Sequence, residues 1–215
     1  MHVTIRSANK EDSHFLAQIL YIASRSHLDE SPWCKIFDET KERTLVLLSK
    51  ITQNSALPWS YFSNFWIAEV DGIPAAAMCG FIPAEAKPLM PVDSELGIAK
   101  NEFDYSDDHL SAISQRLHIA TLGMPDDLPD IWAIESIAVL PEFQGQGLID
   151  HLFKKLFIIG QEKGFKQVQV LCLIGNDCGQ RAFERNGFSV LTQKTNHSFN
   201  ELFGTPGAKL LVRNL

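Results

Sequence analysis

Long apolar runs and one stretch of helical spacing dominate the second half of the chain. Residues 131–139 are apolar at nearly every position and contain no turn former, which is typical of a strand covered on both faces. The next apolar residues recur at helical spacing: Leu148, Leu152, Leu156 and Ile159. Gly164 ends this helix, and a second apolar run follows over 168–174. The pattern predicts a strand, loop, helix, strand unit with parallel strands.

The N-terminal part predicts one strand and two helices. Residues 3–6 are expected to form the strand, and acids at positions 11 and 12 mark the first turn of the first helix. Its buried stripe comprises Phe15, Leu16, Ile19, Leu20 and Ile22. A turn-rich segment over 27–33 separates it from a second helix, expected over about 39–52.

A hairpin and a longer segment follow. The apolar runs at 65–70 and 73–81 flank Asp71-Gly72, which is a strong hairpin signal. Residues 82–130 begin with irregular, proline-containing chain and then predict two helices, over 94–103 and 107–122. A segment of this length between two strands is usually functional or disordered.

The C-terminal part predicts two more strands with a long connection. Residues 188–191 and 208–215 are expected to pair antiparallel, and the turn-rich residues 195–207 join them. Three apolar residues indicate that the connection packs onto the body of the protein: Phe199, Leu202 and Phe203. An exposed flap is the alternative.

Composition narrows the function classes. The chain has 215 residues, 45% of them hydrophobic, and a formal net charge of −7, which disfavours nucleic acid as a partner and suits a cationic amine. The four cysteines show neither zinc spacing nor a small disulfide framework, which favours a reducing, cytoplasmic setting. Neither a signal peptide nor an apolar run of about 18 residues is visible, so no membrane is expected as a partner.

The segment Gln144-Gly145-Gln146-Gly147 joins the central strand to the following helix. Glycines let the backbone approach a ligand closely, and the free N–H groups of a helix's first turn favour an anion such as a diphosphate. A purely structural turn would use the same glycines. The loop is not the dinucleotide fingerprint, because Asp150 stands where the third glycine would be. It is not a Walker loop, because no Gly-Lys-Ser/Thr follows.

Two blocks of sequence resemble one known family. Val139-x-Pro141-x-x-Gln144-Gly145-x-Gly147, after a strand and before a helix, is similar to the acetyl-CoA loop of the GNAT N-acetyltransferases. Asn176, the run 182–188 and the strand after it resemble the closing pattern of the same family. The resemblance is specific over about residues 131–192 and loose elsewhere.

The resemblance implies an α/β GNAT fold in a single domain over residues 1–215. A mixed central sheet of about seven strands would be flanked by helices, with a helical insertion over about 82–130 between the third and fourth strands. The insertion would cover the acceptor site. Its candidates for substrate contact are Tyr105, Asp107, Asp108, His118, Asp126, Asp127 and Asp130. Tyr21 and Trp33 would either line the acceptor groove or simply cover the core.

The resemblance also implies acetyl-CoA as cosubstrate, an amine-bearing acceptor and no metal. The residues that would bind acetyl-CoA are Ile137, Ala138, Val139, Gln144, Gly145, Gln146, Gly147, Leu148, Ile149, Asp150, Asn176 and Phe183. The backbone N–H of Ile137, where the family's central strand kinks, would stabilise the oxyanion of the tetrahedral intermediate. A homodimer is compatible with the family.

Glu135 is the one residue that breaks the apolar run of the central strand. Burial there would raise its pKa and make it a general base for the ammonium of the acceptor. Family members place the base at one of two positions on this face, here Ala133 and Glu135, so only the second can serve. The alternative is a structural carboxylate paired with an arginine, such as Arg25 or Arg181, or capped by backbone.

Three residues depart from the family pattern. Ile149 replaces a small residue, Asp150 adds a carboxylate that would repel a diphosphate, and Phe183 stands where many members carry a proton-donating tyrosine. Either the CoA thiolate would leave unprotonated, or Cys172 or a tyrosine of the insertion would be the substitute acid. The expected function is direct acetyl transfer to a primary amine. The alternatives are a catalytically degenerate acyl-CoA-binding or interaction module, and transfer of a longer acyl chain into a pocket near Ala75, Ala77 and Ala133.

Overall fold

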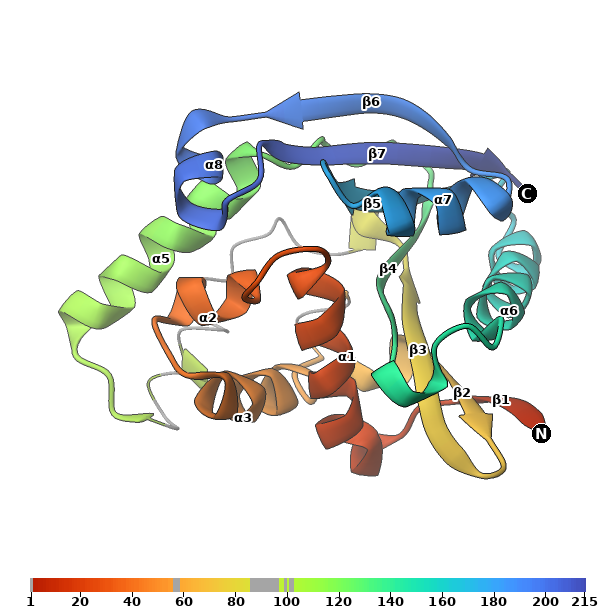
Figure 1. Cartoon of the computed structure of the whole chain (residues 1–215), viewed down its shortest axis with the longest axis horizontal. Helices are drawn as coiled ribbons and strands as arrows, with labels where there is room; N and C mark the ends of the chain where they lie inside the picture. The colour runs from red at the N-terminus through yellow and green to blue at the C-terminus, as the bar shows by residue number, and fades with distance from the viewer. Residues whose placement is uncertain (1, 56–58, 86–96, 99, 101–102) are drawn as a thin grey trace.

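The computed structural model describes residues 2–55, 59–85, 97–98, 100 and 103–215 (Figure 1). Its centre is a seven-stranded sheet in the order β1-β2-β3-β4-β5-β7-β6. The strands are β1 (Val3–Ser7), β2 (Phe65–Val70), β3 (Ile73–Phe81), β4 (Trp132–Val139), β5 (Gln167–Leu173), β6 (Ser189–Thr195) and β7 (Gly207–Asn214). Neighbouring strands are antiparallel except β4 and β5, which are parallel. The mixed sheet confirms the expected fold class.

Helices cover both faces of this sheet (Figure 1). The described α-helices are α1 (Ser13–Arg25), α2 (Pro32–Phe37), α3 (Lys41–Ile51), α5 (Asp107–Leu122), α6 (Leu148–Glu162), α7 (Asp177–Arg185) and α8 (His197–Phe203). Short 3-10 turns lie at Lys10–Asp12, Phe62–Asn64, Pro83–Glu85 and Pro141–Phe143. The helices α1, α2 and α3 lie on one side of β4, and α6 lies on the other.

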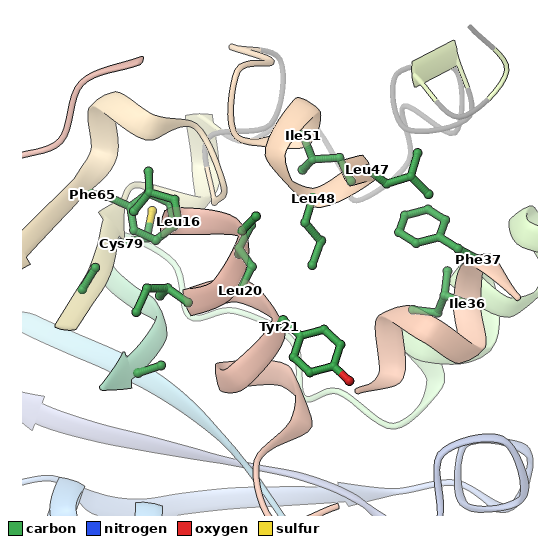
Figure 2. Packing of buried hydrophobic residues seen from close by; sticks show 14 of the residues in the cluster. Leu16, Leu20, Tyr21, Ile36, Phe37, Leu47, Leu48, Ile51, Phe65 and Cys79 are labelled. Atoms are coloured by element: carbon green, nitrogen blue, oxygen red, sulfur yellow. The ribbon is translucent and has the colours of Figure 1, made fainter. Parts of the chain in front are cut away.

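The apolar side chains form two clusters, one on each side of the sheet. Figure 2 shows the first, where Leu16 and Leu20 of α1 and Leu48 of α3 point toward a common core with Phe65 of β2. The second lies under α6 and joins its buried leucines to Ile134 of β4 and to residues of β5. Because β4 is covered on both faces, it carries apolar residues at successive positions.

The β2–β3 hairpin has the predicted strand limits. Asp71 and Gly72 at its turn both have positive φ, 51° and 83°. Aspartate tolerates the left-handed region and glycine adopts it freely, so this pair suits the two-residue turn that the twist of a hairpin favours.

Helix α2 was not predicted, because the segment 27–33 was expected to be turns up to the second helix. Pro32 occupies its first turn, where a missing N–H costs nothing, and the Ser31 hydroxyl accepts a hydrogen bond from the backbone N–H of Trp33 at 3.3 Å. Asp38, with φ 58°, ends the helix. Six residues are too few for a periodic apolar pattern to stand out.

Helix α8 was also missed, since residues 195–207 were expected to be turn-rich and irregular. The Asn196 side chain accepts a hydrogen bond from the backbone N–H of Phe199 at 3.0 Å and so caps the helix. Phe199 and Phe203 are buried in the first core. The prediction that the connection packs onto the body is therefore confirmed, and the alternative of an exposed flap is wrong. The sixth strand is also longer than expected, because it pairs with β7 as far as Thr195.

The segment between β3 and β4 carries α5 with the predicted limits. Ile113 and Leu117 bury one side of α5 in the first core, where the helix contacts α2 and α8. The other predicted helix, over 94–103, falls largely outside the described residues. That the whole segment is an insertion relative to the family stays a prediction.

Candidate functional site

The strands β4 and β5 separate halfway along their length. Their pairing ends at Ile134 and Val170, after which β4 pairs with β3 alone as far as Val139 and β5 with β7 alone as far as Leu173. In Figure 1, β4 continues toward the loop before α6 while β5 stays beside β7. The β4 backbone from Glu135 to Val139 therefore has an edge on the β5 side that no strand of the described residues covers. An extended ligand arm can pair with such an edge.

A β-bulge lies on β4 at this opening. Glu135 pairs with Cys79, but the next pair is Ala138 with Ala77, so β4 has one residue more than β3 over this interval. Ser136 has φ 53°, a conformation uncommon for a residue other than glycine. The N–H of Ile137 follows this residue directly. The structure thus has a kink where the resemblance implied one.

Glu135 stands just before the bulge, two residues after the fully buried Ala133 on the same face of β4. Its side chain is half-buried. Burial raises the pKa of Glu135 to about 8, and the negative charge of Asp127 adds to the rise. Within the described residues no hydrogen bond or ion pair holds this carboxylate, and neither Arg25 nor Arg181 contacts it. A group with a pKa in this range exchanges protons readily near neutral pH.

Asp127 is placed by a buried polar residue of β5. Gln169 is only 1% exposed, and it lies opposite Ala133 in the β4–β5 pair. Its side-chain amide donates to the Asp127 carboxylate and accepts from the backbone N–H of Leu128 at 3.0 Å. Of the acids proposed for substrate contact, Asp127 is the one whose charge acts on Glu135. The sequence offered no reason to prefer Asp127 over the other acids of this segment. The signal that could have found it is Gln169, a polar residue inside a largely apolar strand.

A pocket of about 370 Å³ lies at the start of α6. It is lined by Val139, Phe143, Gly145, Gln146, Gly147, Leu148, Ile149, Asp150 and Arg185. Gly145 and Gly147 have φ of 78° and 72°, in the left-handed region that favours glycine. A Cβ atom at either position would meet nothing within 4 Å, so backbone conformation and not space calls for glycine here.

Seven of the twelve residues proposed for acetyl-CoA line this pocket. Gln144 precedes the pocket without lining it, and Ile137 and Ala138 lie at the β4 bulge. The Oε1 atom of Gln146 is buried and has no hydrogen-bond partner among the described residues. A buried polar atom without a partner is costly unless a ligand satisfies it.

Asp150 does not point freely into the pocket. Its Oδ1 accepts a hydrogen bond from Asn186 Nδ2 at 2.7 Å and one from Arg185 Nη2 at 3.1 Å. Burial acts to raise the pKa of Asp150, but the hydrogen bonds from Asn186 and Arg185 outweigh it and lower the pKa. The carboxylate is therefore ionised and tied to the end of α7. Sequence reasoning missed both Arg185 and Phe143 as pocket residues, and the signal for Arg185 was its place in the closing pattern.

Asn176, directly before α7, and Phe183, within it, lie apart from the pocket lining. The Asn176 side chain accepts from the backbone N–H of Gly179 at 2.9 Å and caps α7. Phe183 is buried edge-on against Phe153 and Phe188 in the second core.

The residues considered as a substitute acid have raised pKa values. Burial raises the pKa of Cys172 to about 11. Burial and a hydrogen bond donated to Glu39 raise the pKa of Tyr105 to about 12, so its hydroxyl is already committed. His118, which was proposed for substrate contact and not as the acid, is exposed on α5.

The two aromatic residues proposed for the acceptor groove have different surroundings. Tyr21 is buried in the first core, as Figure 2 shows. Trp33 is half-buried and stacks on Phe37 and on Trp59, with ring centroids 5.6 Å and 5.7 Å apart. Tyr21 therefore belongs to the hydrophobic core, whereas part of the Trp33 side chain is accessible to solvent.

Among the described residues, no group of three or more His, Cys, Asp or Glu side chains has the arrangement of a metal site. No helix in that part of the chain is both long and apolar enough to cross a membrane.

Solved structures share this fold across nearly the whole chain. An acetyltransferase is 17% identical with a TM-score of 0.61, and 98% of each chain is covered. An N-acetyltransferase from Staphylococcus aureus Mu50 is 15% identical with a TM-score of 0.63, covering 97% of this chain and 99% of its own. The PaiA N-acetyltransferase from Thermoplasma acidophilum, in complex with coenzyme A, is 13% identical with a TM-score of 0.51 and full coverage of both chains. No curated protein sequence matches the chain significantly.

The sequence itself carries the family assignment. The sequence profile of the Acetyltransferase (GNAT) family matches residues 33–188, which is well over half of the chain and includes the bulge, the loop and α7. The chain therefore belongs to the GNAT acetyltransferase family and is an acyltransferase.

Proposed function

We propose that the protein transfers an acetyl group from acetyl-CoA directly to a primary amine, with Glu135 as the general base. The observation that carries this proposal is the carboxylate of Glu135 beside the β4 bulge, which has a pKa of about 8 and no hydrogen bond or ion pair within the described residues. An ammonium has no lone pair, so a base must take one proton before the nitrogen can attack. A carboxylate with this pKa is matched to that task near neutral pH.

The bond changes follow from this arrangement. Glu135 accepts one proton from the ammonium, and the amine nitrogen then bonds to the thioester carbon. The N–H of Ile137 donates a hydrogen bond to the oxyanion that forms on the carbonyl oxygen. The C–S bond breaks, CoA leaves as a thiolate, and the nitrogen gives its second proton to water. Glu135 then releases the first proton to solvent and is ready for the next acceptor. Phe183 cannot supply a proton to the thiolate, but a thiol of pKa about 8.5 is a tolerable leaving group without one.

The residues along the opening suit acetyl-CoA. The uncovered β4 edge at Ile137, Ala138 and Val139 would hold the pantetheine arm as an added strand does. The N–H groups of residues 144–150 would hold the diphosphate at the start of α6, where the helix dipole favours negative charge. Gln146 Oε1, which is buried and unpartnered within the described residues, offers a further polar contact.

The charge around Glu135 supports a cationic acceptor. The negative charge of Asp127 acts on the base, and the whole chain carries a net charge of −7. An ammonium near these two groups would also favour the ionised form of Glu135, which is the form that accepts a proton. The four cysteines, whose spacing fits neither a zinc site nor a small disulfide framework, support a cytoplasmic setting.

The second candidate is a module of the same fold that binds acyl-CoA without catalysis. Phe183, which is buried edge-on against Phe153 and Phe188 and has no proton to donate from its side chain, favours it. Transfer of a longer acyl chain has less support. Ala77 and Ala133 lie in the first core but Ala75 in the second, so the three alanines do not line one pocket.

Calorimetric titration with acetyl-CoA, CoA and a longer acyl-CoA tests the ligand. Micromolar binding of acetyl-CoA supports the proposal, and thiol release should then be measured with a panel of primary amines, including diamines and amino acids. Binding without thiol release for any amine would favour the non-catalytic module. Absence of binding would reject both candidates.

A further inference from the structure

The pocket before α6 contains one cation that comes from a different helix. Arg185 lies in the last turn of α7, yet it lines the pocket together with the loop glycines. Asp150, in the first turn of α6, accepts a hydrogen bond from Arg185 Nη2 at 3.1 Å. The contact joins residues 35 positions apart and so connects the loop that begins α6 with the end of α7.

Asn186 links the Asp150 carboxylate of this ion pair to the backbone of α7. Its Nδ2 donates both to Asp150 Oδ1 at 2.7 Å and to the carbonyl oxygen of Ala182 at 2.9 Å. The Asp150 carboxylate therefore accepts from two donors at the end of α7, Asn186 Nδ2 and Arg185 Nη2, and its fixed position sets the direction of the guanidinium.

Most of the guanidinium remains available. Arginine has five N–H donors, and within the described residues only the Nη2 contact to Asp150 engages them. The side chain is 60% exposed, so the remaining donors can reach a ligand in the pocket. Planar guanidinium groups bind phosphate oxygens through two parallel hydrogen bonds, which lysine cannot do.

We propose that Arg185 binds the diphosphate of acetyl-CoA and that Asp150 is the residue that positions it. The inference rests on the proposed function, because it requires acetyl-CoA to occupy this pocket. It also explains how a carboxylate is tolerated at a helix start that would hold a diphosphate: Arg185 neutralises Asp150 and presents its other donors to the ligand. CoA carries a diphosphate and a 3′-phosphate. We assign Arg185 to the diphosphate, because Arg185 lines the same pocket as Gly145 and Gly147 of the loop that would hold this group.

Arg185→Gln tests the contact, and Arg181→Gln is its matched control. Arg181 is an exposed arginine on the same helix that does not line the pocket, so its substitution removes the same charge without the contact. Calorimetry should give affinity for CoA and dephospho-CoA that is about tenfold lower for Arg185→Gln, and nearly unchanged for Arg181→Gln. Equal effects of the two variants would overturn the proposal. So would a loss for CoA alone, because dephospho-CoA lacks only the 3′-phosphate.

Asp150→Asn tests the positioning role in two backgrounds. Without Arg185 the carboxylate stands uncompensated beside the phosphates, so adding Asp150→Asn to Arg185→Gln should restore affinity at least about threefold. With Arg185 present, Asp150→Asn should not tighten CoA binding, because it releases the guanidinium. Tighter binding in the second case would show that Asp150 merely repels the ligand. If the unaltered protein fails to bind CoA, the proposed function itself fails, whereas binding that is insensitive to Arg185 refutes only this inference.

Discussion

Glu135 on β4 lies directly opposite Cys79 on β3, on the last paired position before the bulge at Ser136. Cys79 is fully buried, and burial together with the charge of Glu135 raises the pKa of its thiol well above the usual value. The carboxylate is thus flanked on its own sheet by a thiol that stays protonated. This pairing places an ionisable group at the only point in the described chain where β4 bends away from β5.

The raised pKa of Glu135 predicts a loss of stability with rising pH. Its pKa is about 8 in the folded protein and 4.5 for a glutamate free of folded surroundings, so above pH 4.5 the unfolded chain binds fewer protons than the folded one. The stability that this group contributes is present below pH 4.5 and is lost as the pH rises to about 8.

Glu135→Gln removes this dependence. The variant should melt at the same temperature as the unaltered protein near pH 4.5 and several degrees higher at pH 8.5, since 1 kcal/mol corresponds to about 2–4 °C for a chain of this size. Differential scanning calorimetry across this range measures the difference. If the difference in melting temperature between the two proteins were the same at every pH, the pKa of Glu135 would not be raised in the folded protein.

Asp127 should tune the base. Because its negative charge raises the pKa of Glu135, Asp127→Asn should lower that pKa and move the acidic limb of the pH profile of kcat/KM to lower pH. Asp130→Asn is the control, since Asp130 is an exposed acid of the same segment, whereas the charge that raises the pKa of Glu135 is that of Asp127. An identical displacement of the limb in both variants would mean that general surface charge, and not the placement of Asp127 by Gln169, is responsible.

Gly147 should matter for the ligand beyond its effect on stability. Gly147 and Gly204 both have φ above 70° and both have open space around an added Cβ, but only Gly147 lines the pocket. Alanine at either position should cost about 1–2 kcal/mol of folding free energy through the left-handed conformation. Only Gly147→Ala should also weaken acetyl-CoA binding. Equal CoA affinities in the two variants would show that the loop does not hold the cosubstrate.

Local patterns were enough to predict much of the fold. The two-residue turn at Asp71-Gly72 indicated the β2–β3 hairpin, and the apolar runs indicated β4 and β5 because strands covered on both faces carry little else. Helix α8 could not be predicted in this way. It is a single short helix whose formation depends on the tertiary burial of Phe199 and Phe203.

The same distinction holds for the site. Glu135 was visible in the sequence because it interrupts an apolar strand, and Gly145 and Gly147 because their spacing resembles a family loop. The placement of Asp127 depends on a hydrogen bond from Gln169, 42 residues away, and that of Arg185 on a contact with Asp150, 35 residues away. Such contacts depend on the tertiary arrangement, which no local pattern encodes.

The pH dependence of thiol release from acetyl-CoA, compared between the unaltered protein and Glu135→Gln with the same amine, tests the central claim most directly. With Glu135 as the base, the rate should rise with pH as this residue ionises. In Glu135→Gln, kcat should be lower by about 10² or more and the acidic limb should be lost, while acetyl-CoA affinity is retained. Turnover and a pH profile like those of the unaltered protein would contradict the assignment of Glu135 as the base.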